Sequence, residues 1–225
     1  MENMKTQTNS QKYEGQCKFC GSDFSKKEIL SHLDSCQQRT KSKSSNLRNL
    51  RLQITDRYSK NFWLIVEVDN SAKFKDLDKL IRDVWVECCG HLSLFGDYGN
   101  EIKKSKIIME TLQPGDTVPY IYDFGSSTEL IIKAIAYSSF KLIEKKIELV
   151  ARNYLPPSNC AKCGQQATWI CTTCSDEEDE SPLVCDDCAE KYHSEEEDHY
   201  LLQLANSPRS GVCGYEPEEP LDKLF

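Results

Sequence analysis

The spacing of the cysteines is the strongest structural signal in this sequence. Twelve cysteines occur in 225 residues, and eight of them form pairs separated by two residues. The chain begins without the apolar stretch of a secretion signal, so we expect a cytoplasmic, reducing location, where disulfides are rare. Paired thiols in that setting are typical metal ligands. The sequence therefore predicts a zinc protein.

The first cysteine group, between Cys17 and Cys36, has the spacing of a small zinc module. A tight turn would present two thiols, and a helix would present a His and a Cys on one face. Ser25 and Glu28 form the capping-box pattern that begins such a helix. The expected ligands are Cys17, Cys20, His32 and Cys36. Their order resembles the Cys-Cys-His-Cys relatives of the small ββα fingers; the alternative is a disordered tail.

The last cysteine group offers eight ligands in four pairs, enough for two tetrahedral zinc sites. The order of the pairs resembles the B-box-like double zinc modules, whose sites are interleaved in a cross-brace. That resemblance implies that the first and third pairs share one ion, held by Cys160, Cys163, Cys185 and Cys188. The second and fourth pairs would share the other ion, held by Cys171, Cys174, His193 and His199. Glu195 remains an alternative to one of the two histidines.

The segment between the two cysteine groups supplies the apolar core. Residues 50–54 alternate as a half-exposed strand that forms a hairpin with residues 61–69, and residues 118–124 and 129–137 read as a second hairpin. Between them, apolar residues at helical spacing from 74 to 88 predict one principal helix. Residues 145–153 alternate as a further strand. The predicted fold class is α+β: a mostly antiparallel sheet with one packed helix.

The order of these elements resembles the plasmid Ri open-reading-frame-three-like family, also labelled transposon passenger (TnpR-like). The resemblance covers about residues 48–155 and 206–216, through LRLQI, NFWLIVEV, FKDLDKLI, HLSLF, GDYG, LQPGD, YIYDFG and NSPRSGVCGYE. Many members follow YDFG with two acids, a tryptophan, an acid and a histidine, and residues 126–130 here lack the acid pair, the tryptophan and the histidine. Any polar site of the family at that position is therefore expected to be weakened.

Three cysteines lie outside these sites. Cys88 and Cys89 are adjacent and have no second pair nearby, so we expect them to be small core residues. The family resemblance implies that Cys213, within VCGY, belongs to the closing motif of the core and is not a zinc ligand. The prediction is therefore three structural zinc ions per chain.

These observations divide the chain into five parts. They are an N-terminal zinc finger (1–37), a basic linker (38–48), an α+β core domain (49–159), a double zinc module (160–205), and the closing motif with a tail (206–225). The apolar runs are too short for a membrane span, because about 20 residues are needed. We expect no contact with a membrane, and the oligomeric state is not predicted.

Charge separates the two ends of the chain. Residues 1–51 carry 10 basic and 5 acidic side chains, whereas residues 160–225 carry 4 and 16. The acidic end would repel phosphates, which favours a protein partner. We therefore expect a non-enzymatic, zinc-stabilised adaptor. The alternative is a nucleic-acid-associated protein linked to mobile elements, which would contact phosphates through residues 17–51 and their basic arm.

Catalysis has one candidate pair, His91 as a base and Asp123 as the group that orients it. The sequence contains no nucleophile motif, phosphate loop or H-E-x-x-H motif to accompany them. A lone histidine beside apolar residues more often makes a structural hydrogen bond. We therefore predict that the protein is not an enzyme.

Overall fold

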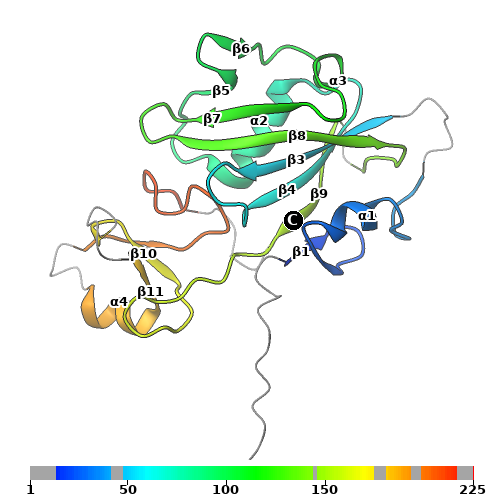
Figure 1. Cartoon of the computed structure of the whole chain (residues 1–225). Coiled ribbons are helices and arrows are strands. Elements are labelled where there is room, and N and C mark those ends of the chain that lie inside the picture. The colour runs from blue at the N-terminus through cyan, green and yellow to red at the C-terminus, as the bar shows by residue number, and fades with distance from the viewer. Residues whose placement is uncertain (1–13, 42–47, 144–145, 175–180, 194–198, 217–224) are drawn as a thin grey trace, which may run out of the picture.

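The computed structural model describes residues 14–41, 48–143, 146–174, 181–193, 199–216 and 225. Its largest element is a nine-stranded sheet, shown in Figure 1, in which all neighbouring strands are antiparallel. The strands lie in the order β2 (Asp23–Ser25), β1 (Glu14–Cys17), β9 (Ile147–Asn153), β4 (Trp63–Val68), β3 (Asn49–Asp56), β8 (Thr128–Ser138), β7 (Thr117–Tyr122), β5 (Ser93–Asp97) and β6 (Asn100–Ile102). The α+β class predicted from the sequence is confirmed.

The two predicted hairpins form the centre of this sheet. Strands β3 and β4 pair from Leu50 opposite Val68 to Thr55 opposite Trp63, and β7 pairs with β8. Strand β3 also pairs with β8, so the two hairpins join into one sheet. The expectation of a half-exposed first strand is wrong, because β3 lies between two neighbours and its first four residues are all buried.

The principal helix packs on one face of the sheet, behind the central strands in Figure 1. It begins as α2 (Phe74–Ile81), where the Asp76 carboxylate accepts a hydrogen bond from the Lys73 backbone N–H at 2.9 Å. The predicted helix continues only to Val86, as a π-helical segment, η1 (Arg82–Val86). The short helix α3 (Ile108–Thr111) lies at the same core. Phe74, Leu77 and Trp85 are fully buried there.

The N-terminal finger packs on the opposite face of β4 and β9 instead of standing apart from the sheet. Side chains alternate along a strand; in β4, Leu64 faces the main core while Trp63 and Ile65 face the finger. The finger's helix, α1 (Glu28–Leu33), contributes Ile29 and Leu33 to the same cluster. These two side chains and the two from β4 are fully buried. Figure 1 shows the finger in blue beside β9. The finger therefore completes the core from a second side.

The last cysteine group forms a separate small lobe. Its sheet has the order β11 (Leu183–Val184), β10 (Trp169–Cys171) and β12 (Leu201–Gln203), and its helix is α4 (Asp186–Tyr192). Its apolar cluster is small. The acidic runs at 175–180 and 194–198, which include Glu195, lie outside the described residues. Among the helices that are described, none combines the length and apolar character needed to cross a membrane.

Candidate metal centres

Metal-ligand side chains gather in four groups of four within the described residues. In each group the ligand atoms lie within 4.8 Å of one another, and all twelve cysteines are free thiols. Sulfur and imidazole nitrogen are the donors that Zn²⁺ prefers in tetrahedral sites. The four groups therefore suit a metal such as zinc.

The first group contains the four residues expected from the N-terminal spacing: Cys17, Cys20, His32 and Cys36. A tight turn presents the first two thiols, with Gly21 in a left-handed conformation (φ 67°). The Sγ of Cys20 lies 3.3 Å from the Nε2 of His32 on α1. The predicted capping pattern is present, since the backbone N–H of Ser25 donates to Glu28 and the N–H of Glu28 donates to Ser25 Oγ.

Burial of the first group disfavours the charged thiolate form of its cysteines when no cation is nearby. Desolvation raises the pKa of the Cys17 thiol to about 12. Ionising this side chain at neutral pH therefore requires a nearby cation, and a divalent metal held by the same four residues would supply one. Cys17 is fully buried in the apolar cluster between the finger and the sheet. Metal binding at Cys17 is therefore linked to the packing of the finger.

The second group contains Cys160, Cys163, Cys185 and Cys188. Cys185 and Cys188 lie at the start of α4, and the Sγ of Cys163 lies 3.5 Å from that of Cys185. Although burial opposes it, hydrogen bonds from the backbone N–H groups of Cys185 and Cys163 lower the pKa of Cys160 to about 6. Burial raises the pKa of Cys188 to about 12. One thiolate is thus available at neutral pH to begin metal binding, which would deprotonate its neighbours.

The third group contains Cys171, Cys174, His193 and His199. The Nδ1 of His199 lies 3.4 Å from the Sγ of Cys171 and 3.6 Å from that of Cys174. The Nδ1 of His193 lies 3.7 Å from the Sγ of Cys174. The structure thus interleaves the four pairs in the order that the cross-brace resemblance implied, and it brings both histidines to the thiols.

The fourth group, Cys88, Cys89, His91 and Cys213, was missed by sequence reasoning. The expectation that both adjacent cysteines are core residues is wrong, because Cys89 is exposed and Cys88 only partly buried. The Sγ of Cys89 lies 2.9 Å from the Nε2 of His91 and 3.8 Å from the Sγ of Cys213. The local signal was Cys-Cys-Gly-His at 88–91, but its fourth member lies more than 120 residues later.

The candidate catalytic pair lies at this fourth group. The Nε2 of His91 is 3.5 Å from the Asp123 carboxylate, but it is nearer to the sulfurs of Cys89 (2.9 Å) and Cys213 (3.3 Å). Asp123 binds the fully buried Arg209 at 2.7 Å. Hydrogen bonds from the Gly125 N–H and from Arg209 lower the pKa of Asp123. The imidazole is therefore directed at thiols, and the carboxylate is committed to an arginine.

The basic arm expected to contact phosphates, residues 37–51 with five basic side chains, is partly buried. Arg39 forms a 2.6 Å ion pair with Glu67, and Arg51 pairs with the same carboxylate at 2.9 Å and with Asp34 at 2.9 Å. Both arginine side chains and Glu67 are almost fully buried. Lys43 and its neighbours at 42–47 lie outside the described residues. Two of the five cations of the arm therefore face the protein interior.

No model of a known protein family matches the chain, and no curated protein resembles it in sequence. Among solved structures, it is similar to the crystal structure of a protein of unknown function from Methanosarcina mazei Go1, with 17% identity and a TM-score of 0.41. The match covers 47% of this chain and 69% of that chain. The function must therefore be argued from the sites themselves, and membership of the plasmid Ri family stays a prediction.

Proposed function

We propose that the protein is a non-enzymatic adaptor of the plasmid Ri open-reading-frame-three-like family, in which structural zinc supports two interaction modules on an α+β core. The observation that carries this proposal is the meeting of the twelve predicted ligands in three groups of four. Four protein ligands fill a tetrahedral zinc shell and leave no position for water or substrate. Zinc in these three groups would therefore stabilise structure and would not catalyse a reaction.

The surface of the double zinc module favours a basic protein as the partner. Helix α4 exposes Asp187 and Glu190, in a segment of the chain with a large excess of acid. Tyr192 is 43% exposed and Tyr200 is 61% exposed on the same module. Tyrosines are enriched in protein interfaces, and complementary charge steers association. An acidic surface repels nucleic-acid phosphates, so this module would recognise lysine- and arginine-rich protein segments.

The nucleic-acid alternative loses part of its support. It needs exposed cations between residues 17 and 51, yet Arg39 and Arg51 are held by Glu67 inside the fold. The exposed Lys27, Lys41 and Arg48 remain available in the described part of this segment. Three scattered cations provide few of the phosphate contacts that non-specific binding requires.

A binding experiment on the full chain separates these functions. The probes are a fluorescent lysine- and arginine-rich peptide and a DNA duplex of equal length, both at low salt. We expect the double variant Asp187→Asn/Glu190→Gln to bind the peptide at least about threefold more weakly, because each exposed ion pair contributes up to ~1 kcal/mol. Asp187 and Glu190 are chosen because Asp186 already accepts hydrogen bonds from Trp169 and Thr168.

The matched control removes two acids far from the module. Asp97 and Glu110 are exposed on the core domain, so Asp97→Asn/Glu110→Gln removes the same two negative charges from the chain. We expect this control to bind the peptide like the unaltered protein. Equal binding by all three proteins would contradict the adaptor surface, and a salt-sensitive DNA complex without peptide binding would favour the nucleic-acid function instead.

A further inference from the structure

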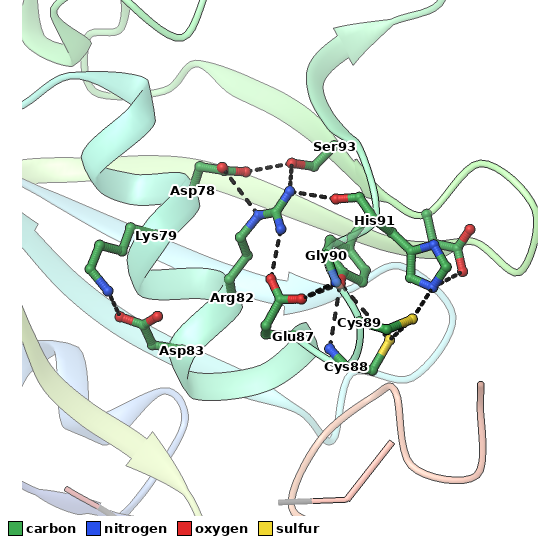
Figure 2. A network of polar contacts seen from close by, with 12 residues as sticks. Asp78, Lys79, Arg82, Asp83, Glu87, Cys88, Cys89, Gly90, His91 and Ser93 are labelled. Atoms are coloured by element: carbon green, nitrogen blue, oxygen red, sulfur yellow. Dashed lines mark hydrogen bonds and ion pairs between the residues drawn. The ribbon is translucent and has the colours of Figure 1, made fainter. Parts of the chain in front are cut away.

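The fourth group of ligand-type side chains has the dimensions of a tetrahedral zinc site. Zn–S bonds of about 2.3 Å place two sulfurs of a tetrahedron about 3.8 Å apart. The Sγ of Cys88 lies 3.7 Å from that of Cys89, which in turn lies 3.8 Å from the Sγ of Cys213. The Nε2 of His91 lies 3.3 Å from the Sγ of Cys213. Figure 2 shows the Cys89 sulfur and the His91 ring directed at one another.

The backbone explains how two adjacent cysteines reach one point. The chain bends at Cys88 and Cys89, one residue after η1 ends, so their side chains do not alternate as they would on a strand. Gly90 then takes a left-handed conformation (φ 80°), which turns His91 back toward the sulfurs. Cys213 also has a positive φ, 54°, although it is not glycine. A non-glycine residue in that region is uncommon and marks a constrained position.

Buried polar groups surround the four ligands. Arg209, whose side chain is fully buried, donates from Nε to the Sγ of Cys88 at 3.4 Å and pairs with Asp123 at 2.7 Å. The Asp123 carboxylate lies 3.5 Å from the His91 ring. Hydrogen bonds to ligands from a surrounding shell orient them and tune the metal. Arg209 is thus placed to stabilise negative charge on a coordinating sulfur.

Exposure distinguishes this group from the other three. Cys89 and Cys213 are both exposed, whereas at least two cysteines of every other group are buried. Cys213 also lines an open hollow of about 630 Å³, together with Ser126, Thr173 and Gly211. The hollow lies where the core, the double zinc module and the closing motif (residues 206–216, here called the closing segment) meet. Small molecules in solution can therefore reach these sulfurs.

We propose that Cys88, Cys89, His91 and Cys213 bind a fourth zinc ion, which fastens the closing segment to the core and exchanges with solvent faster than the other three. The ion would join the closing segment to the core, because three of its ligands lie at residues 88–91 and the fourth is residue 213. Ser207 already contacts this region by donating from its hydroxyl to the carbonyl of Trp85. This inference does not rest on the adaptor function.

Native mass spectrometry of the full chain, purified under reducing conditions without chelator, tests the proposal. We expect four zinc ions in the unaltered protein and three in Cys213→Ser. His91→Asn is a second variant that should lose the same single ion. Ser126→Ala alters the rim of the hollow without removing a ligand, so it should retain four.

Two further measurements separate loss of one site from general unfolding. A chromogenic chelator should remove one zinc per chain quickly from the unaltered protein, and this fast phase should be missing in Cys213→Ser. In the cobalt-loaded protein, Cys213→Ser should remove about a quarter of the thiolate-to-cobalt absorbance, because the site supplies three of the twelve cysteine ligands. Loss of more than one ion from both variants would contradict a self-contained site.

The number of ions distinguishes this proposal from the three-zinc function. Three ions in the unaltered protein and three in Cys213→Ser would overturn the fourth site and leave the structural zinc modules intact. A disulfide among Cys88, Cys89 and Cys213 in freshly reduced and desalted protein, with no fast-exchanging ion, would also overturn it. Fewer than three ions would contradict the zinc modules themselves.

Discussion

Glu67 shows how a single residue couples the finger to the sheet. Its carboxylate is fully buried and binds Arg51 from the neighbouring strand β3 as well as Arg39 from the segment after the finger. Arg39 also donates to the carbonyl of Leu33 at the end of α1. Two buried cations share one anion, and Asp34, which is largely exposed, supplies the second negative charge. Removing one charged member of such a network strongly destabilises the fold, because the remaining charges stay buried without a partner.

We predict that Glu67→Gln destabilises the protein by about 3–5 kcal/mol, since it leaves two buried arginines without their shared carboxylate. Urea unfolding followed by circular dichroism measures this difference. The control is Glu129→Gln, which breaks the exposed pair between Arg57 and Glu129 and should cost no more than about 1 kcal/mol. Equal losses in the two variants would show that the buried network contributes nothing special.

Gly15 is required where strand β1 joins the sheet. A Cβ at this position would lie 2.6 Å from the ring of Trp63 and would collide with the carbonyl oxygen of Arg152. Gly15 pairs with Asn153 of β9, so the collision falls on the contact between the finger and the sheet.

We predict that Gly15→Ala lowers the free energy of unfolding by about 1–3 kcal/mol, the usual cost of overpacking a filled core. Thermal unfolding measures the effect. Gly125→Ala is the control, because a Cβ there meets no atom closer than 3.5 Å. A Gly15→Ala protein as stable as the control would mean that β1 does not pair with β9 in solution.

At the scale of elements, the finger acts as part of the core. Its helix α1 and its first strand cover Trp63 and Ile65, which lie on the face of β4 opposite the principal helix. Loss of metal from the finger should therefore loosen β4 and β9, although neither strand supplies a ligand. The described residues of the double zinc module form their own small cluster, which contains no residue of β4 or β9.

Hydrogen exchange of two matched variants tests this coupling. Cys36→Ser and Cys171→Ser each remove one ligand from one zinc group. We predict that Cys36→Ser increases exchange at the backbone of β4 and β9, whereas Cys171→Ser increases exchange only around β10 and β12. The same exchange pattern in both variants would contradict the different placements of the two modules.

Local patterns predicted most of the elements and three of the metal groups. The hairpins and the Cys-x-x-Cys pairs could be predicted because their paired residues are close in sequence. The amphipathic helix could be predicted because its apolar residues repeat at a regular spacing. The fourth group was not readable, since Cys213 reaches Cys89 only through the tertiary fold. The burial of Arg39 and Arg51 was hidden for the same reason: an arginine in a polar segment resembles a solvated one until Glu67 is found beside it.

At the scale of the whole molecule, the two ends depend on metal to different degrees. The main core contains more than twenty buried apolar side chains, which come from six strands and three helical segments. Hydrophobic burial alone can therefore stabilise it. The double zinc module has only a few buried apolar residues, among them Val184 and Ala189. A segment with so small a core needs its metal in order to fold.

We predict that chelator and reductant together unfold residues 160–205 first and leave a folded core that melts at a lower temperature than before. Limited proteolysis should cut within the double zinc module, and readdition of zinc should restore resistance. Magnesium at the same concentration is the control and should restore nothing, because it prefers oxygen ligands. Simultaneous loss of all structure on chelation would contradict an independent apolar core.

The most direct test of structural zinc is diffraction from crystals of the full chain, measured on both sides of the zinc absorption edge. We predict anomalous peaks at the centres of the groups around Cys17, Cys160 and Cys171, each about 2.3 Å from its sulfurs. Disulfide bonds in place of these groups, or ligand atoms with no anomalous peak between them in protein prepared without chelator, would contradict the central claim.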